Sequence, residues 1–227
     1  MLSRILYLTW HGIGTAKSGV GEEARPYWLP ADTFAEALDV AAEIEAETAM
    51  PIRFTFDDGN QSDHALALPL LVDHKRTATF FVCAGRIGQP DFLCASQLKE
   101  LVAAGMRIGS HGFDHLRWRN ATDATLFHEL HDGRRAIEDA IGCSADVAST
   151  PFGELDRRAV DAAKSAGYTS LFASSGGIAT ADTGLVPRNT VKFGFRPARD
   201  LPPMASWSRW AAASLYDTAR RVKYGFY

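Results

Sequence analysis

Cysteine is scarce in this chain, and its scarcity excludes two classes of site. The 227 residues include only three cysteines, Cys83, Cys94 and Cys143. An odd number at wide spacing argues against a disulfide framework and against a cysteine-rich zinc site. We therefore expect all three to be buried free thiols.

The sequence also lacks an excess of charge and a long apolar run. A formal net charge of −3 provides no basic surface of the kind that binds nucleic acid. No run of about 18 apolar residues is present, so no transmembrane helix is expected. The apolar stretch at the N-terminus is interrupted by Thr9 and His11 and is too short for a secretion signal. The expected location is the cytoplasm, unless a leader has been removed.

What is present is an alternation of apolar segments and segments with helical periodicity. Strands are expected over residues 4–10, 51–56, 77–83, 106–110, 146–150, 169–174 and 185–192. Helices are expected over residues 33–47, 62–75, 96–105, 123–141 and 156–167, with Thr33 and Ser62 as the first two N-caps. Strands separated by helices predict parallel pairing with right-handed crossovers. We expect one α/β domain over residues 1–195, and a helix and tail over residues 196–227 that pack on it.

An open doubly wound sheet and a closed barrel both fit this pattern. The glycines after the first strand, in HGIGTAKSG, lack the spacing of a dinucleotide-binding loop, and a loop rather than a helix follows them. This favours a barrel. In such barrels the catalytic groups gather where the strands end, at their C-terminal face.

Polar side chains stand at those strand ends. The first strand ends in His11, the second in the pair Asp57 and Asp58, and the fourth in Ser110 and His111, with His115 just beyond. Asp-Gly is also a common turn dipeptide, so DDG alone indicates a turn. Its position level with the other polar groups changes that interpretation to a site.

The spacing of His111 and His115 suggests a metal site. Two histidines four residues apart lie on the same face of a helical turn, although such a pair alone also fits two solvated loop histidines. With one aspartate they provide three nitrogen and oxygen ligands, as in a catalytic zinc site that keeps a position open for water. A divalent metal is therefore expected, zinc first, with cobalt, nickel or manganese as alternatives.

The motifs TFDDG and, about fifty residues later, SHGFDH resemble those of the polysaccharide deacetylase family, carbohydrate esterase family four with its NodB-homology domain. The resemblance covers about residues 4–192. It implies a distorted (β/α)7 barrel of parallel strands and removal of acetyl groups from N-acetylated saccharides. It further implies that Asp57 is the general base and that Asp58, His111 and His115 are the metal ligands.

The third motif of the family is altered here. Arg-Pro-Pro-Tyr-Gly becomes STPFG at residues 149–153, so Ser149 stands where an arginine would orient the base. Arg188 is a candidate replacement, and a surface arginine is the equal alternative. The main chain of Phe152 and Gly153 is expected to contact the substrate or its oxyanion, because a backbone N–H donor does not depend on the side chain.

The last motif of the family, an apolar run ending in Leu-His, is absent from the C-terminal half. Instead LYLTWHG at the N-terminus ends an apolar strand in a histidine, which resembles the circularly permuted poly-N-acetylglucosamine deacetylases. Barrel closure places the first and last strands side by side, so His11 is the candidate general acid. A structural histidine in a glycine-rich loop is the alternative.

These features lead to three functional hypotheses. The first is a metal-dependent deacetylase of an N-acetylhexosamine saccharide, the second an O-acetyl esterase, and the third a binding protein that retains the metal site without catalysis. The partner expected is an acetylated oligo- or polysaccharide, not nucleic acid. The aromatic and basic segment over residues 207–227 could also contact a membrane surface or a glycan-assembly protein, although packing on the barrel is preferred.

Overall fold

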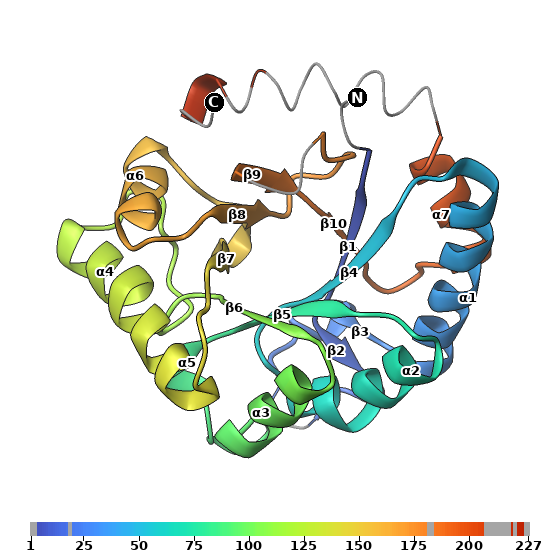
Figure 1. The fold of residues 1–227 in the computed structure, drawn as a ribbon, viewed down its shortest axis with the longest axis horizontal. Coiled ribbons are helices and arrows are strands. Elements are labelled where there is room, and N and C mark those ends of the chain that lie inside the picture. The colour runs from blue at the N-terminus through green and yellow to red at the C-terminus, as the bar shows by residue number, and fades with distance from the viewer. Residues whose placement is uncertain (1–3, 18–19, 181–183, 207–218, 220–221, 225–227) are drawn as a thin grey trace.

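Eight parallel strands form one sheet that curls into a nearly closed barrel (Figure 1). The computed structural model describes residues 4–17, 20–180, 184–206, 219 and 222–224. In spatial order the strands are β10 (Asn189–Thr190), β1 (Leu6–Trp10), β4 (Ile52–Phe56), β5 (Ala78–Val82), β6 (Arg107–Ser110), β7 (Val147–Ser149), β8 (Ser170–Ala173) and β9 (Gly184–Pro187). All seven expected strands are present, and the barrel expectation is confirmed.

The seventh expected strand, residues 185–192, is divided into two short strands, β9 and β10. These two strands pair with opposite edges of the sheet and so bring its ends together. The first part, β9, pairs with β8, whereas the second part, β10, pairs with β1. The change of partner occurs at Arg188, whose N–H still donates to Ala173 O of β8 at 2.9 Å. One strand thus joins the first and last edges of the sheet.

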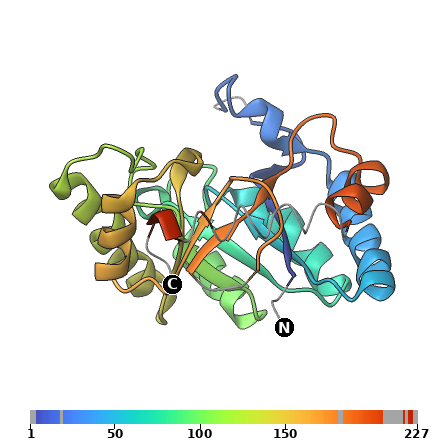
Figure 2. The ribbon, with the colours of Figure 1, turned by 90° about the horizontal axis from the view of Figure 1, so that it is seen from above.

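Helices cover the outside of the barrel (Figures 1 and 2). They are α1 (Ala31–Thr48), α2 (Leu68–Asp73), α3 (Ala95–Ala103), α4 (Asp123–Phe127), α5 (Gly133–Ile141) and α6 (Arg157–Ser165). The helix α7 (Pro197–Met204) packs beside α1. Most of the tail expected after it, and the segment 207–227 in particular, lies outside the described residues. Within the described residues, no helix has the length and apolar character needed to cross a membrane.

Two of the expected helix starts are wrong. The helix α1 begins at Ala31, before Thr33, and its N-cap is Pro30 without a side-chain hydrogen bond. The helical segment after β4 begins at residue 61, so Ser62 is already inside it. Its hydroxyl instead accepts the N–H of Ile13, in the short strand β2 (Gly12–Ile13), at 3.2 Å. In both cases a tertiary contact, or the preceding proline, replaces the local cap that the sequence pattern suggested.

Two wide π-helical turns interrupt the helices next to the site. The first, η2 (Asp63–Ala67), leads into α2 just before Pro69, which has no N–H to donate. The second, η4 (His128–Asp132), joins α4 to α5 within the single helical segment expected over residues 123–141. Both turns lead directly into the following α-helix, so the chain stays helical throughout. Each turn contains a fully buried carboxylic residue, Asp63 in η2 and Glu129 in η4.

Strand residues are buried on both faces, as a sheet covered by helices requires. In β1 every residue is buried, and Trp10 packs edge-on against Phe34 of α1. Of the three cysteines expected to be buried thiols, only Cys83 is buried; Cys94 is half-buried and Cys143 is exposed. Cys94 precedes α3 and Cys143 follows α5, where the chain returns to the surface.

Candidate active site

The polar residues at the strand ends converge on one cavity of about 530 Å³. Its lining includes seven of the eight predicted site residues, namely His11, Asp57, Asp58, His111, His115, Phe152 and Gly153. The eighth, Arg188, is fully buried behind the cavity wall. A neighbouring cavity of about 400 Å³ shares four lining residues with the first, so these residues stand between the two: His11, Ala24, Tyr27 and Asp58.

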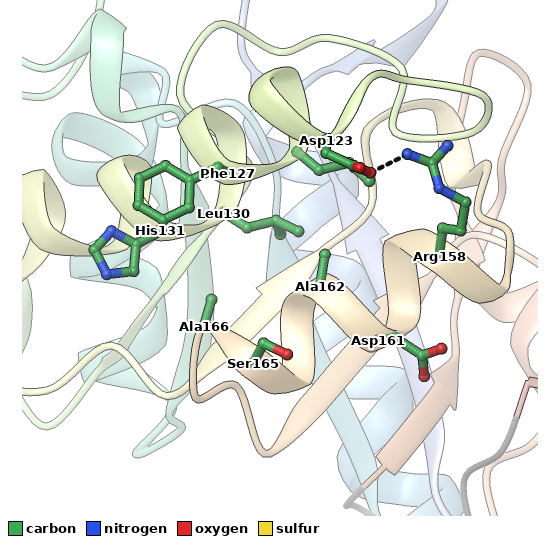
Figure 3. Close-up of a pocket in the computed structure, with 10 residues that line it drawn as sticks. Asp123, Phe127, Leu130, His131, Arg158, Asp161, Ala162, Ser165 and Ala166 are labelled. Carbon is green, nitrogen blue, oxygen red and sulfur yellow. Dashed lines mark hydrogen bonds and ion pairs between the residues drawn. The ribbon is translucent and has the colours of Figure 1, made fainter.

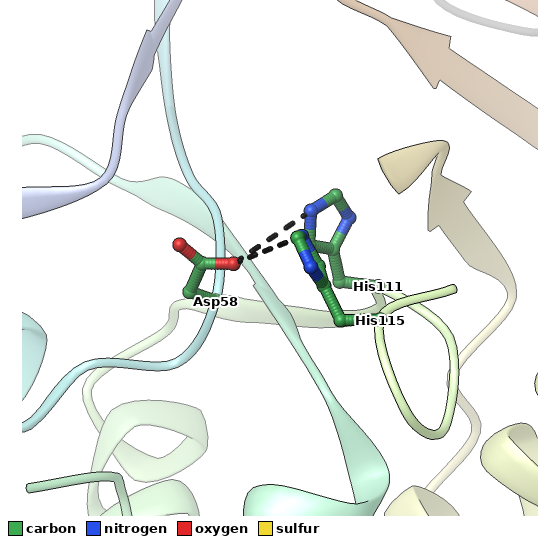
Figure 4. Close-up of side chains that lie close together, drawn as sticks. All are labelled: Asp58, His111 and His115. Atoms are coloured by element: carbon green, nitrogen blue, oxygen red, sulfur yellow. Dashed lines mark ion pairs between the residues drawn. The ribbon is translucent and has the colours of Figure 1, made fainter. Parts of the chain in front are cut away.

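Three side chains form the candidate metal centre (Figure 4). The Asp58 Oδ1 atom lies 3.3 Å from His115 Nε2 and 3.9 Å from His111 Nε2. The Nδ1–H of His111 donates to the main-chain oxygen of Ser149 at 2.9 Å, so its Nε2 lone pair faces the centre. Two imidazole nitrogens and one carboxylate oxygen are a common donor set for a catalytic divalent metal, and the residues present fit such an ion.

An unusual backbone conformation directs these side chains. Asp58, His115 and Phe152 have φ angles of +79°, +61° and +59°, which side chains other than glycine rarely adopt. Asp58 is the first residue after β4 to leave extended geometry in this way, one position before Gly59. Its side chain therefore turns toward the centre instead of alternating away from Asp57. Such strain typically accumulates at functional sites.

Asp57 forms a buried bidentate ion pair with Arg188. The two guanidinium nitrogens Nη1 and Nη2 donate to the two carboxylate oxygens at 2.7 and 2.8 Å. Burial by itself would raise the pKa of Asp57, but the charges of Arg188 and His111 outweigh burial and hold that pKa well below its usual value. The surface alternative for Arg188 is wrong, because this side chain is fully buried.

Ser149 makes room for this arginine. Its hydroxyl contacts Nη2 of Arg188 and lies 3.3 Å from Asp57 Oδ2. A second arginine at position 149 would bring another buried positive charge to the same carboxylate. The small residue in β7 and the arginine after β9 are thus complementary, a relation that no sequence spacing indicated.

His11 follows β1 at the wall shared by the two cavities. Its ring lies 5.0 Å from that of Tyr27, and its main-chain oxygen accepts from Asn60 Nδ2 at 3.0 Å. Its buried Nδ1 has no hydrogen-bond partner among the described residues. Burial lowers the pKa of His11, although the nearby carboxylates of Asp58 and Asp57 act in the opposite direction.

Phe152 and Gly153 also line the cavity, from the turn η5 (Pro151–Gly153). The Phe152 ring lies 4.7 Å from the His115 ring, and the Arg117 guanidinium covers it at 4.1 Å. The N–H of Gly153 donates to Thr150 O at 3.0 Å. The turn thus holds an exposed aromatic ring beside the candidate metal centre.

Sequence analysis did not identify Arg86 as part of the site. Its Nη1 lies 3.3 Å from Asp58 Oδ1, and its guanidinium is 5.1 Å from the Phe92 ring. Burial alone would raise the pKa of Asp58, but His11, His111, His115 and Arg86 together lower it. A lone arginine after a strand has no motif that would have revealed this contact.

Another hollow, of about 380 Å³, lies between α4, η4 and α6 (Figure 3). Apolar residues dominate it, among them Phe127 and Leu130, and an ion pair joins Asp123 to Arg158 at its rim. None of the residues of the candidate metal centre lines it. It is separate from the cavity at the strand ends, where His11, Asp57 and the candidate metal centre meet.

Comparison with known proteins decides the family. The polysaccharide deacetylase profile matches residues 45–171, more than half of the chain, and the match includes Asp57, Asp58, His111 and His115. The chain belongs to the polysaccharide deacetylase family. His11 and Arg188 lie outside the matched range, at the two ends that the barrel closure brings together.

Individual relatives of the family agree with this assignment. A peptidoglycan-N-acetylglucosamine deacetylase of Bacillus cereus is 32% identical over 121 residues, covering 53% of this chain and 54% of the relative. The chain spans about half the length of the curated relatives that it matches.

Solved structures show the same fold. The deacetylase PplD of Streptococcus pyogenes, solved with acetate, superposes with a TM-score of 0.77 at 19% identity, covering 90% of this chain and 99% of PplD. IcaB from Ammonifex degensii superposes with a TM-score of 0.73 at 19% identity, covering 91% and 97% of the two chains. Both superpositions cover about nine-tenths of this chain.

Proposed function

We propose that this polysaccharide deacetylase is a metal-dependent hydrolase that removes acetyl groups from N-acetylhexosamine units of a saccharide. The observation that carries the proposal is the arrangement of the two neighbouring aspartates. Asp58 faces two histidines as a ligand, while Asp57 pairs with Arg188 and stays ionised. A binding protein would have no use for the second carboxylate. The name of the Bacillus cereus relative supports the sugar class.

Each residue has a definite role in this proposal. Asp58, His111 and His115 hold a divalent cation, zinc being the first candidate, which lowers the pKa of water and polarises a carbonyl. Asp57 accepts the proton of the attacking water, and Arg188 keeps its carboxylate ionised and oriented. The main-chain N–H of Phe152 donates to the oxyanion that develops on the acetyl group.

His11 donates a proton to the amine that leaves. An amine is a poor leaving group unless it is protonated as the C–N bond breaks. Because the pKa of His11 is lowered, its protonated form is a stronger acid toward that amine. For the same reason, the protonated form is a minor species at neutral pH. His11 and Phe152 line the same cavity, so a proton donor and the proposed oxyanion donor can both reach a substrate bound there.

The cavity suits a sugar. Its volume is within the usual range for small-molecule sites, and Tyr27 and Phe152 offer rings on which the apolar face of a sugar can stack. The charged residues Glu23, Arg117 and Lys192 also line it and can bond to hydroxyl groups. The expected substrate is therefore an acetylated oligo- or polysaccharide.

The test is acetate release from N-acetylglucosamine oligomers, with O-acetylated xylan oligomers as the ester control, in the presence of zinc. We expect release from the amide substrate and a loss of about 10²–10⁴-fold in Asp57→Asn, which should keep its zinc. Release from the ester alone would make the protein an O-acetyl esterase. Stoichiometric zinc without release from either substrate would make it a binding homologue.

A further inference from the structure

We propose that Glu129 is a positioning residue that holds the ligand-bearing loop of residues 111–118 in its metal-binding shape. Glu129 lies in the π-helical turn η4 and its side chain is fully buried. It is outside the cavity and can touch neither substrate nor cation, so its effect has to act through the loop. The inference rests on the proposed metal site.

The carboxylate of Glu129 accepts three N–H groups from this loop. Oε1 accepts the main-chain N–H of Asp114 at 2.8 Å, and Oε2 accepts that of Leu116 at 3.3 Å. The third donor is the indole Nε1 of the fully buried Trp118, 3.3 Å from Oε2. The two main-chain donors are the residues immediately before and after the ligand His115, so the carboxylate holds its backbone from both sides.

The loop needs such a support because its conformation is strained. His115 has a φ of +61°, which residues other than glycine rarely adopt. Hydrogen bonds from the N–H groups on both sides of His115 to one buried carboxylate hold the backbone in this conformation. Without the carboxylate, the N–H groups on both sides of His115 would be free to turn toward other partners.

Glu129 also lies close to the backbone beside the other histidine ligand, His111. A Cβ atom on Gly112, the residue after His111, would lie only 2.2 Å from Glu129 Oε2. Gly112 also has a φ of +85°. The carboxylate therefore packs directly on the backbone beside His111, and the wide turn of η4 brings the side chain to this point. One buried group contacts the chain beside both histidine ligands.

Glu129→Gln is the test variant, because glutamine keeps the shape but directs an N–H₂ group toward an N–H donor. Glu138→Gln is the matched control. Glu138 lies on the same helical segment and likewise accepts a loop N–H, that of Ala145 at 3.0 Å, but its loop carries no metal ligand. Trp118→Phe removes the third donor together with part of a buried ring, and tests the same contact in case Glu129→Gln fails to fold.

Two measurements are made on the purified full chain: the zinc dissociation constant by titration, and amide hydrogen exchange at Asp114 and Leu116. In Glu129→Gln we expect the zinc dissociation constant to rise by about 10–100-fold. This is the usual effect of removing a group that orients a metal ligand through hydrogen bonds. Exchange at the two amides should become at least about tenfold faster. Trp118→Phe should shift the dissociation constant in the same direction by less, and Glu138→Gln should leave both measurements unchanged.

Unchanged zinc affinity in folded Glu129→Gln, or in Trp118→Phe should Glu129→Gln not fold, would overturn the proposal. So would two amides that stay as protected as in the wild type, or an equal loss of affinity in Glu138→Gln. A wild-type chain that binds no zinc would instead refute the proposed function. The exchange rates would still decide whether Glu129 holds the loop, so the two failures are distinguishable.

Discussion

Asp57 and Asp58 are neighbours in the chain but have different partners. Asp57 belongs to a buried pair with Arg188, and Asp58 faces two histidines and Arg86. The left-handed turn at Asp58 brings both carboxylates to one cavity, whereas a regular strand would direct them to opposite faces. Adjacent residues can therefore perform two tasks in one cavity without competing for the same partner.

His11→Ala should affect amides and activated esters unequally. We expect amide deacetylation to fall by about 10²-fold or more, since the leaving amine loses its proton donor. Hydrolysis of 4-nitrophenyl acetate should fall much less, because phenolate leaves without such help. Steady-state rates on the two substrates decide it. Equal losses would assign His11 to the fold or the metal, and no loss would make it an ordinary loop histidine.

His115 should make the chelator-treated protein less stable in acid. Burial first, and then the charge of His111, lower its pKa from 6.5 to about 4. The unfolded chain therefore binds this proton more tightly than the folded chain does. The stabilisation is complete above about pH 6.5 and is lost as pH falls through about 4, at most about 3 kcal/mol.

His115→Asn should flatten this dependence, because asparagine tolerates the left-handed backbone and does not titrate in this range. Urea unfolding at half-unit steps between pH 7 and 4, with a chelator present, measures the free energy of unfolding. A variant whose stability falls as steeply as that of the wild type would show that another group is responsible.

The residues that sequence analysis could identify are those in local motifs. Asp57, Asp58, His111 and His115 lie within two short segments, and their spacing carries the chemistry. Arg188 could only be offered as one of two alternatives, because its partner Asp57 is far away in the chain and salt bridges follow no spacing rule. The sequence predicts only that Glu129 lies in a helix. Its burial depends on a π-helical turn that no residue pattern predicts.

The sequence predicts which helices and strands form more accurately than it predicts where they begin and end. Hydrophobic periodicity depends on many residues, whereas a helix start depends on one hydrogen bond that tertiary contacts can replace. Thr33 lacks the cap contact that its sequence pattern suggested. By contrast Asp156 caps α6, where Oδ1 accepts the N–H of Ala159 at 2.8 Å and Oδ2 that of Asn120 at 3.0 Å.

Substitution at these two helix starts should separate the real cap from the apparent one. We expect Asp156→Ala to lower the free energy of unfolding by about 1–2 kcal/mol, the usual effect of losing an N-cap. Thr33→Ala should change it by less than about 0.5 kcal/mol, because no capping bond is removed. Chemical denaturation at neutral pH compares them. A larger loss for Thr33→Ala would contradict the helix start at Ala31.

The proposed metal ligands connect two strands that are far apart in the chain, β4 and β6. Asp58 follows β4, whereas His111 and His115 follow β6, so an ion bound to all three binds the folded chain much better than the unfolded one. Zinc at about 100 times its dissociation constant should stabilise the protein by about 2.7 kcal/mol. The resulting rise in Tm should be about 5–10 °C for a domain of this size.

In Asp58→Asn we expect less than half of that rise in Tm, as asparagine suits the backbone but brings no charge to the ion. The control is His131→Gln, whose histidine lies beside Asp132 outside the site and should not matter. Calorimetry with and without zinc measures each Tm. A full shift in Asp58→Asn would remove Asp58 from the ligand set.

The partner change at Arg188 has a consequence for how the chain is made. β1 pairs with β4 on one side, and among the described residues the strand that pairs with its other edge is β10, about 180 residues later. At about 5–20 residues per second, synthesis leaves that edge open for about 10–35 s. An open strand edge is a template for pairing with other chains. We therefore expect the nascent protein to need protection from aggregation until its last strand emerges, and Asp57 has no Arg188 to pair with before then.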